Sequence, residues 1–205
     1  MLTLLPERTV HTMNHPATQS SPIFAAGPLV LAALIVVAAL TRVLPHPPNF
    51  SPIAAIALFG GAYFASRAWA LLVPLAGLLI SDLVLASING GIYASWFSGS
   101  GIWVVYGCIA LTAVVGFGLR GKVSGTRVLG FSLAATALFY LATNFASWLG
   151  NPMYPQTSPG LVASYVAGIP FLQWSVLGTL VYAAALFGGF ELLRRQLPAL
   201  RAQTV

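Results

Sequence analysis

Long apolar stretches with very few charges between them are the feature that most limits what this chain can fold into. The 205 residues include only nine Lys or Arg and three Asp or Glu, and 58% of the residues are hydrophobic. Soluble domains carry about 25% charged residues. At 6% charged, this chain cannot cover a soluble core with a hydrated surface. The composition therefore predicts an integral membrane protein.

Six segments are long and apolar enough, or nearly so, to cross a bilayer, which takes about 20 residues of helix. The second segment is short, and we expect Pro170 to divide the last, overlong one into a short piece and a full span. The expected fold is an all-α polytopic bundle of six transmembrane helices. A polar segment at 1–23 precedes the transmembrane domain at 24–196, and 197–205 is a cytoplasmic tail. The expected spans are 24–44, 53–66, 68–88, 102–119, 128–149 and 161–193.

The positions of the basic residues predict the orientation, because cytoplasmic loops of membrane proteins carry an excess of Lys and Arg. With six spans, every Lys and Arg except Arg42 falls on one side of the membrane. Both termini are therefore expected in the cytoplasm, with the chain in a bacterial inner membrane. The net charge of +6 comes from scattered residues. They form no continuous basic stripe, so the bilayer is an expected partner and nucleic acid is not.

The connections on the outer side have a different character, since they are almost uncharged and rich in Pro, Asn, Tyr and Trp. They comprise residues 46–52, 89–97 and 151–157. Aromatic faces and amides in such a surface suit a flat or amphipathic small molecule. The alternative is a belt of aromatic residues at the level of the lipid headgroups.

Asp82 is the most informative single residue, because a carboxylate inside a membrane span is costly and usually functional. It lies roughly 9 Å below the outer end of its span at 1.5 Å per residue. We expect it to be accessible from the outer side, where it would anchor a polar or cationic group directly or through water. Arg42 lies at a similar depth. The alternative is a structural ion pair that joins two helices.

A second group of candidates lies near the outer end of the fifth span. The spacing of Asn144, Ser147 and Trp148 places them on one helix face, where they either line a pocket or bond to a neighbouring helix. Gln173 and Trp174 lie at a similar depth in the last span. The expected ligand-binding residues are Asn49, Asp82, Tyr93, Trp96, Asn144, Trp148, Tyr154, Gln173 and Trp174.

Enzymatic and metal-dependent functions are not indicated. Three acidic residues offer little material for acid–base catalysis, and no nucleophile–base pair or phosphate-binding loop is present. No cofactor is expected. His46 is interpreted as a loop histidine, because a metal site needs several ligands. Cys108 is interpreted as a small apolar residue of the bundle.

Ala57, Gly61 and Ala65 form a row of small residues spaced by four, which lets two helices approach closely. This row has two possible roles. It packs inside the bundle, or it is a docking face for a partner membrane protein.

Several short motifs resemble those of S components, the substrate-binding membrane subunits of energy-coupling-factor vitamin transporters. The similar stretches are Pro48-Asn49-Phe50-Ser51-Pro52-Ile53, Leu58-Phe59-Gly60-Gly61, Pro74-Leu75-Ala76-Gly77 and Ser81-Asp82. A closer similarity is to an uncharacterised bacterial six-helix membrane-protein family. It covers about 41–193 and includes Thr143-Asn144-Phe145, Met153-Tyr154-Pro155, Ala167-Gly168-Ile169-Pro170-Phe171 and Leu186-Phe187-Gly188-Gly189.

The S-component resemblance implies a six-helix fold that binds a vitamin or micronutrient on the outer side and topples in the bilayer to release it. A T subunit with two ATPases would supply the energy. The Ala-x-x-x-Ala row that S components often carry on their first helix is not present between Ala32 and Ala39. The alternative function is a non-catalytic accessory subunit of a larger membrane complex. An outer cavity favours uptake, whereas a tightly packed bundle with an exposed face bearing Ala57 and Gly61 favours the accessory subunit.

Overall fold

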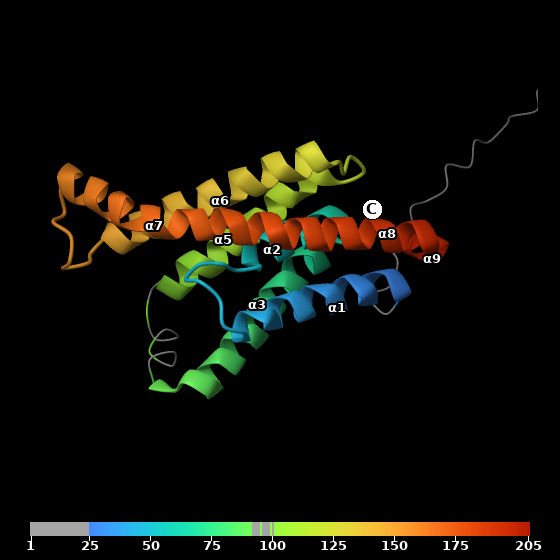
Figure 1. Ribbon diagram of the computed structural model, residues 1–205, viewed down its shortest axis with the longest axis horizontal. Coiled ribbons are helices and arrows are strands. Elements are labelled where there is room, and N and C mark those ends of the chain that lie inside the picture. The colour runs from blue at the N-terminus through green and yellow to red at the C-terminus, as the bar shows by residue number, and fades with distance from the viewer. Residues whose placement is uncertain (1–24, 92–94, 96–98, 100) are drawn as a thin grey trace, which may run out of the picture.

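The computed structural model describes residues 25–91, 95, 99 and 101–205, and in this part of the chain every regular element is a helix (Figure 1). Among these described residues, five helical stretches are long and apolar enough to cross a membrane. The expected all-α membrane protein is confirmed at this level. The five stretches are α1 (Ala26–Leu40) with η1 (Thr41–Val43), α3 (Arg67–Asn89), α5 (Gly101–Gly116) with η2 (Phe117–Leu119), α6 (Gly125–Trp148), and α7 (Ser158–Ala183) with η3 (Ala184–Gly188) and α8 (Gly189–Gln196).

Large apolar side chains on the outside of these helices agree with a lipid environment. A soluble protein seldom exposes an extensive apolar surface. Here exposed apolar residues recur on each of the five stretches, including Val37, Leu83, Trp103, Leu141 and Val181. The chain is therefore a multi-pass membrane protein whose helices turn much of their apolar surface outward.

The last stretch differs from the expected division at Pro170, because α7 continues through this residue without a break. A proline in a membrane helix removes one backbone hydrogen bond. Neighbouring groups can restore the lost bonding, so the helix need not end. The Gln173 side chain donates a hydrogen bond to the Pro170 carbonyl at 3.2 Å. The irregularity lies further along, at the π-helical turn of η3.

The second expected span, at 53–66, is the short helix α2 (Ile53–Tyr63), which occupies the centre of the bundle. Its 11 residues extend about 16 Å, roughly half the thickness of a bilayer core. Every residue from Ala55 to Tyr63 is buried. The helix packs mainly against α5 and α3. α2 is therefore a half-length interior helix that does not reach across a bilayer by itself.

Two glycines allow the close approach of α2 and α5. A Cβ atom on Gly61 would collide with the carbonyl oxygen of Ala113, and one on Gly116 would lie 2.7 Å from the Leu58 carbonyl oxygen. Ala57 and Gly61 are fully enclosed by this contact. They therefore pack inside the bundle and cannot form a docking face for a partner in this structure. Ala65 is exposed, beyond the end of α2.

The C-terminal end of α2 lies among the basic residues. Arg120 donates from Nε to the Gly61 carbonyl at 2.9 Å and from Nη2 to the Phe64 carbonyl at 2.8 Å, which satisfies carbonyls that a helix end leaves free. We call this the basic end. Among the basic residues that the structure describes, all except Arg42 lie at this end, namely Arg67, Arg120, Lys122, Arg127, Arg194, Arg195 and Arg201.

Residues 197–205 were expected to be a tail, but they pack against the bundle at the basic end. They contain the short helix α9 (Pro198–Gln203), which lies against α1, and Leu200 is buried. The Gly27 amide donates to the Gln203 side chain at 2.7 Å, and the Val205 amide donates to the Tyr63 carbonyl at 3.0 Å. The start of α1 and the end of the chain therefore lie together (Figure 1).

Candidate functional site

A cavity of about 310 Å³ lies inside the bundle, next to the N-terminal end of α2. We call it the central cavity. The polar side chains that line it come from η1, the loop 44–52, α6 and α7. They include Arg42, Asn49, Ser51, Thr136, Ser175 and Thr179. Thr136 lies 12 residues before the end of α6 at Trp148, or about 18 Å along the helix axis. The cavity therefore reaches the middle of the bundle.

The loop before α2 creates this space because it enters the bundle without forming a helix. At Pro47 to Phe50 it makes a β-turn in which the Phe50 amide donates to the Pro47 carbonyl at 3.0 Å. Pro48 at the second position and Asn49 with a φ of 64° at the third match a type II turn. Asparagine tolerates this left-handed conformation better than most residues. The Asn49 side chain consequently stands beside the cavity.

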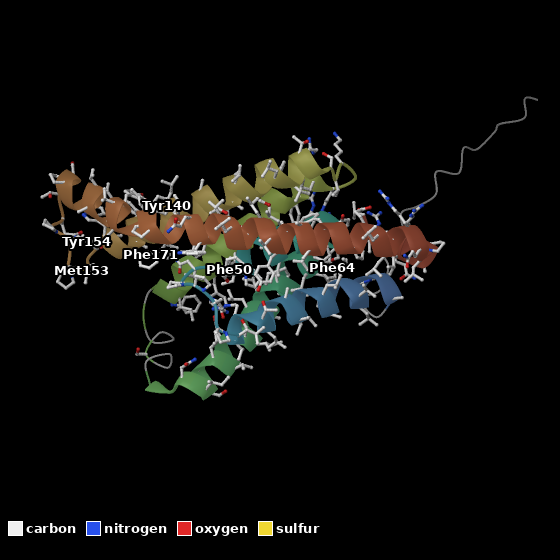
Figure 2. The ribbon with its side chains drawn as sticks, in the orientation of Figure 1. Phe50, Phe64, Tyr140, Met153, Tyr154 and Phe171 are labelled. Carbon is white, nitrogen blue, oxygen red and sulfur yellow. The ribbon has the colours of Figure 1, made fainter. Side chains whose placement is uncertain are left out.

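Helix α7 holds this loop in place. The Phe50 ring lies 5.9 Å from that of Tyr182. Gly178 lets the loop approach α7 closely, because a Cβ atom at this position would lie 2.6 Å from the Ser51 amide nitrogen. Figure 2 shows Phe50 near the middle of the long axis, between Phe64 at the basic end and Phe171 toward the other end. The loop thus forms one wall of the cavity, and α2 begins near the middle of the bundle.

A second cavity of about 310 Å³ adjoins the first and shares Asn49, Phe139 and Ser175 with it. We call it the upper cavity. It lies between α6 and α7, and its lining includes Asn144, Ser147 and Tyr154. Figure 2 shows Tyr154 at the end of the molecule opposite the basic end. The two cavities together connect that end with the middle of the bundle.

Asp82 is the centre of a buried network next to the central cavity. Arg42 donates from Nη1 to the Asp82 Oδ1 atom at 2.6 Å and to the Ser81 hydroxyl at 2.5 Å. The Tyr106 hydroxyl donates to Asp82 Oδ2 at 3.0 Å. Both carboxylate oxygens therefore have partners, and Asp82 is only 2% exposed. The structural ion pair, which the sequence left open as the alternative, is the arrangement that the structure shows.

The expectation that Asp82 is accessible is wrong for this structure, because the residue is buried and lines neither cavity, and its role as a ligand anchor stays a prediction. Its partner Arg42 lines the central cavity with a side chain that is 12% exposed. Within the described chain, the side-chain hydrogen bonds of Arg42 are both made from Nη1, and Nε and Nη2 make none. The group that faces the cavity is a guanidinium with free donors, positioned by a carboxylate behind it.

Two further features make the floor of the central cavity rich in donors. The Thr136 hydroxyl donates inside the protein, to the Ser132 carbonyl at 2.9 Å and the Thr179 hydroxyl at 3.2 Å, so Thr179 is the one of the two that can donate to a ligand. Both side chains are almost fully buried. The cavity is also lined by Ile53 and Ala54, in the first turn of α2. The first amides of a helix have no partner within the helix and carry a partial positive charge. Arg42 and the start of α2 therefore favour an electronegative group on the ligand.

The other expected ligand-binding residues have different positions. Asn49, Asn144 and Tyr154 line the cavities, although the Asn144 amide also donates to the Tyr140 carbonyl at 2.9 Å. The Trp148 indole donates to the Pro155 carbonyl at 2.9 Å and so holds the loop between α6 and α7. Gln173 is exposed, and neither it nor Trp174 lines the two cavities. Tyr93 and Trp96 lie outside the described residues.

Several cavity residues were not among the sequence candidates. Thr136, Ser175 and Thr179 are hydroxyl residues inside apolar helices, and this pattern was the available signal. His46 also lines the central cavity, and its Nε2 atom lies 3.1 Å from the Arg42 carbonyl oxygen. Cys108 is buried in α5. No group of three or more His, Cys, Asp or Glu residues that could hold a metal occurs within residues 25–91, 95, 99 and 101–205.

Comparison with known proteins gives one match. The model of a family described as a family of unknown function (DUF6580) matches residues 24–200. No curated protein and no solved structure matches the chain. The similarity to an uncharacterised family, expected from the motifs, is thus confirmed, and the resemblance to S components stays a prediction.

Proposed function

Since the chain belongs to this family, whose function is unknown, we propose its function from the geometry of the two cavities. The protein binds a small polar solute inside the bundle and takes part in its uptake across a bacterial inner membrane. The observation that carries this proposal is the central cavity at mid-bundle, lined by Arg42, Asn49 and the hydroxyls of Thr136 and Thr179. Cavities of about 300–1,000 Å³ with a few convergent polar groups are typical of small-molecule sites.

The side of the membrane from which the solute enters follows from the charge distribution. The basic end carries most of the Lys and Arg residues, which favours the cytoplasmic side for it. The upper cavity lies toward the opposite end, where Tyr154 is located. A solute therefore enters from the outer side through the upper cavity, and its most polar group reaches Arg42 in the central cavity.

The chemistry of the site differs from the cationic ligand that a free Asp82 would select. Arg42 neutralises that carboxylate and presents donors to the cavity. In membrane transporters, the starts of half-length helices often face the anionic groups of a substrate. A vitamin-sized molecule with a carboxylate or carbonyl group fits this arrangement.

Passage to the basic end requires a conformational change. Below the central cavity, α2 fills the bundle with buried aromatic side chains, and Phe59 and Tyr63 pack against Phe187 and Phe190. If a T subunit with ATPases drives this change, as the resemblance to S components implies, it docks elsewhere than on Ala57 and Gly61. The accessory-subunit alternative loses its expected docking face by the same observation.

Native mass spectrometry of the protein extracted from its host membrane tests this proposal. The wild-type protein should retain a small molecule of vitamin size. Ser175 lines both cavities, so Ser175→Phe should fill the site and abolish retention. Gln173→Phe adds the same side chain to an exposed position on the same helix and should preserve retention. Absence of a retained molecule from the wild type, or equal retention by both variants, would refute the proposal.

A further inference from the structure

A third cavity, of about 570 Å³, lies between α6 and the continuous stretch formed by the end of α7, η3 and α8, and it is independent of the site above. We call it the α6–α7 groove, and its lining includes Val128, Ser132, Ala183, Ala184, Gly188 and Arg195. From the groove we propose that the protein binds an anionic glycerophospholipid, with an acyl chain between the helices and the phosphate at the basic end.

The groove begins where the contacts between the two helices end. Toward the loop 149–157, α6 and α7 touch closely, and a Cβ atom on Gly168 would collide with the Asn144 side chain. The last hydrogen bond between them joins Thr136 and Thr179. Beyond this pair there is a hollow between the helices, because Ala183 and Ala184 have small side chains and Gly188 has none.

The interior of the groove suits an acyl chain. Its walls are formed largely by apolar residues, including Val128, Leu129, Leu180 and Phe187. The groove lies on a surface that also exposes Leu133, Leu177 and Val181, as expected of helix faces in contact with lipid. A water-filled groove at this position would leave these apolar walls hydrated at a cost.

The end of the groove near Ser124 and Gly125 offers cationic and backbone donors. Gly125 begins the 24-residue helix α6, whose amides at Gly125 and Thr126 remain available there, while the Arg127 amide donates to the Ser124 hydroxyl at 3.4 Å. Arg195 lines the groove, and no hydrogen-bond acceptor is recorded for it within the described chain. Glu191 also lines the groove, and its Oε1 atom accepts from Tyr63 at 2.6 Å and from Arg194 at 3.0 Å, so Arg194 compensates its charge.

An independent observation comes from deeper in the groove, at Ser132. This residue is fully buried, and its Oγ atom has no hydrogen-bond partner. Buried hydroxyls in proteins nearly always have a partner. Because Ser132 lines the groove, an ester oxygen of a bound lipid would supply the acceptor that the protein does not.

Charge selects the anionic class of lipid. The basic end carries seven Lys and Arg residues, and Glu191 is the acidic residue among them in the described chain. Basic pockets between transmembrane helices on the cytoplasmic side are typical sites for anionic headgroups. A second copy of the chain or a partner helix would need no such charge. The experiment below distinguishes these two occupants of the groove from a lipid.

The test uses the purified, delipidated full-length protein with synthetic phosphatidylglycerol or phosphatidylcholine, and native mass spectrometry measures the retained lipid. We expect phosphatidylglycerol to be retained in preference to phosphatidylcholine. Arg195→Gln should weaken this retention about fivefold, the effect of one basic residue near an anionic headgroup. Arg201→Gln removes the same charge from the basic end outside the groove and should leave retention unchanged.

A second variant tests the groove itself. Ala184→Trp places a large side chain in the hollow from an exposed position and should abolish retention in a folded protein. Equal retention of both lipids, equal losses in Arg195→Gln and Arg201→Gln, or undiminished retention in Ala184→Trp would each overturn the proposal. A wild-type dimer that Ala184→Trp dissociates would overturn it too, by making the groove an interface between two copies.

Discussion

The buried network of Arg42, Asp82 and Tyr106 gives the sharpest prediction about stability. Asp82→Asn keeps the size of the side chain but removes the charge that compensates Arg42. Breaking a buried ion pair from one side costs about 3–5 kcal/mol. Because Arg42 is 12% exposed to the central cavity, we expect the lower limit, about 3 kcal/mol. For a chain of this size, that corresponds to a decrease in Tm of about 6–12 °C.

The combined replacement Arg42→Met, Asp82→Leu and Tyr106→Phe is the informative comparison. It removes both charges and the Tyr106 hydroxyl, and Ser81 keeps its bond to the Leu78 carbonyl, so it should be less destabilising than Asp82→Asn alone. The assay is thermal unfolding of the purified proteins in one detergent, followed by tryptophan fluorescence. The combined variant should also lose the small molecule that the wild type retains, because it lacks Arg42. An Asp82→Asn protein as stable as the wild type, or a combined variant that is less stable than Asp82→Asn, would refute the reasoning.

Three further predictions concern the backbone and the helix ends, and thermal unfolding measures each. Gly61→Ala should destabilise the protein by about 1–3 kcal/mol because the added methyl group meets the α5 backbone, while Gly130→Ala, which adds a methyl group in open space, should not destabilise it. Asn49→Gly should keep the turn and its stability but weaken ligand retention, whereas Asn49→Ala should cost a further 1–2 kcal/mol or so from the positive φ. Arg120→Gln should cost about 1.5–3 kcal/mol through its bonds to the end of α2, with the neighbouring Lys122→Gln as the near-neutral control. A stable Gly61→Ala or Arg120→Gln, or equal effects of the two Asn49 variants, would contradict these reasons.

The helical membrane fold was predictable because its signal is spread over the whole chain. Apolar segments of sufficient length have few other structures available in a bilayer. The depth of Arg42 left its pairing with Asp82 open as an alternative, since two opposite charges inside apolar helices are stable mainly when they meet, but depth did not decide for it over an accessible carboxylate. The uninterrupted course of α7 through Pro170 was not, because it depends on which neighbouring groups restore the backbone bonding.

The candidate site was less predictable because it depends on where α2 begins. The pattern of residues 44–66 shows a proline-rich loop and a short apolar helix, but it does not show that the loop descends to mid-bundle. The sequence also did not decide whether side chains such as Trp148 and Gln173 face a ligand or bond to the protein itself. Each bonds to a backbone carbonyl close to it in sequence, at Pro155 and Pro170, and those bonds depend on local geometry.

The contact between α1 and the segment around α9 has a consequence for biogenesis. Gly27 and Gln203 are 176 positions apart, so their hydrogen bond cannot form until nearly all of the intervening chain has left the ribosome. Until then, the beginning of α1 and the carbonyl of Tyr63 lack a permanent partner. An insertase or chaperone that shields nascent helices would therefore have to protect the beginning of α1 for longest. Ribosome-stalled chains that end before Leu200 should be most sensitive to protease at the beginning of α1.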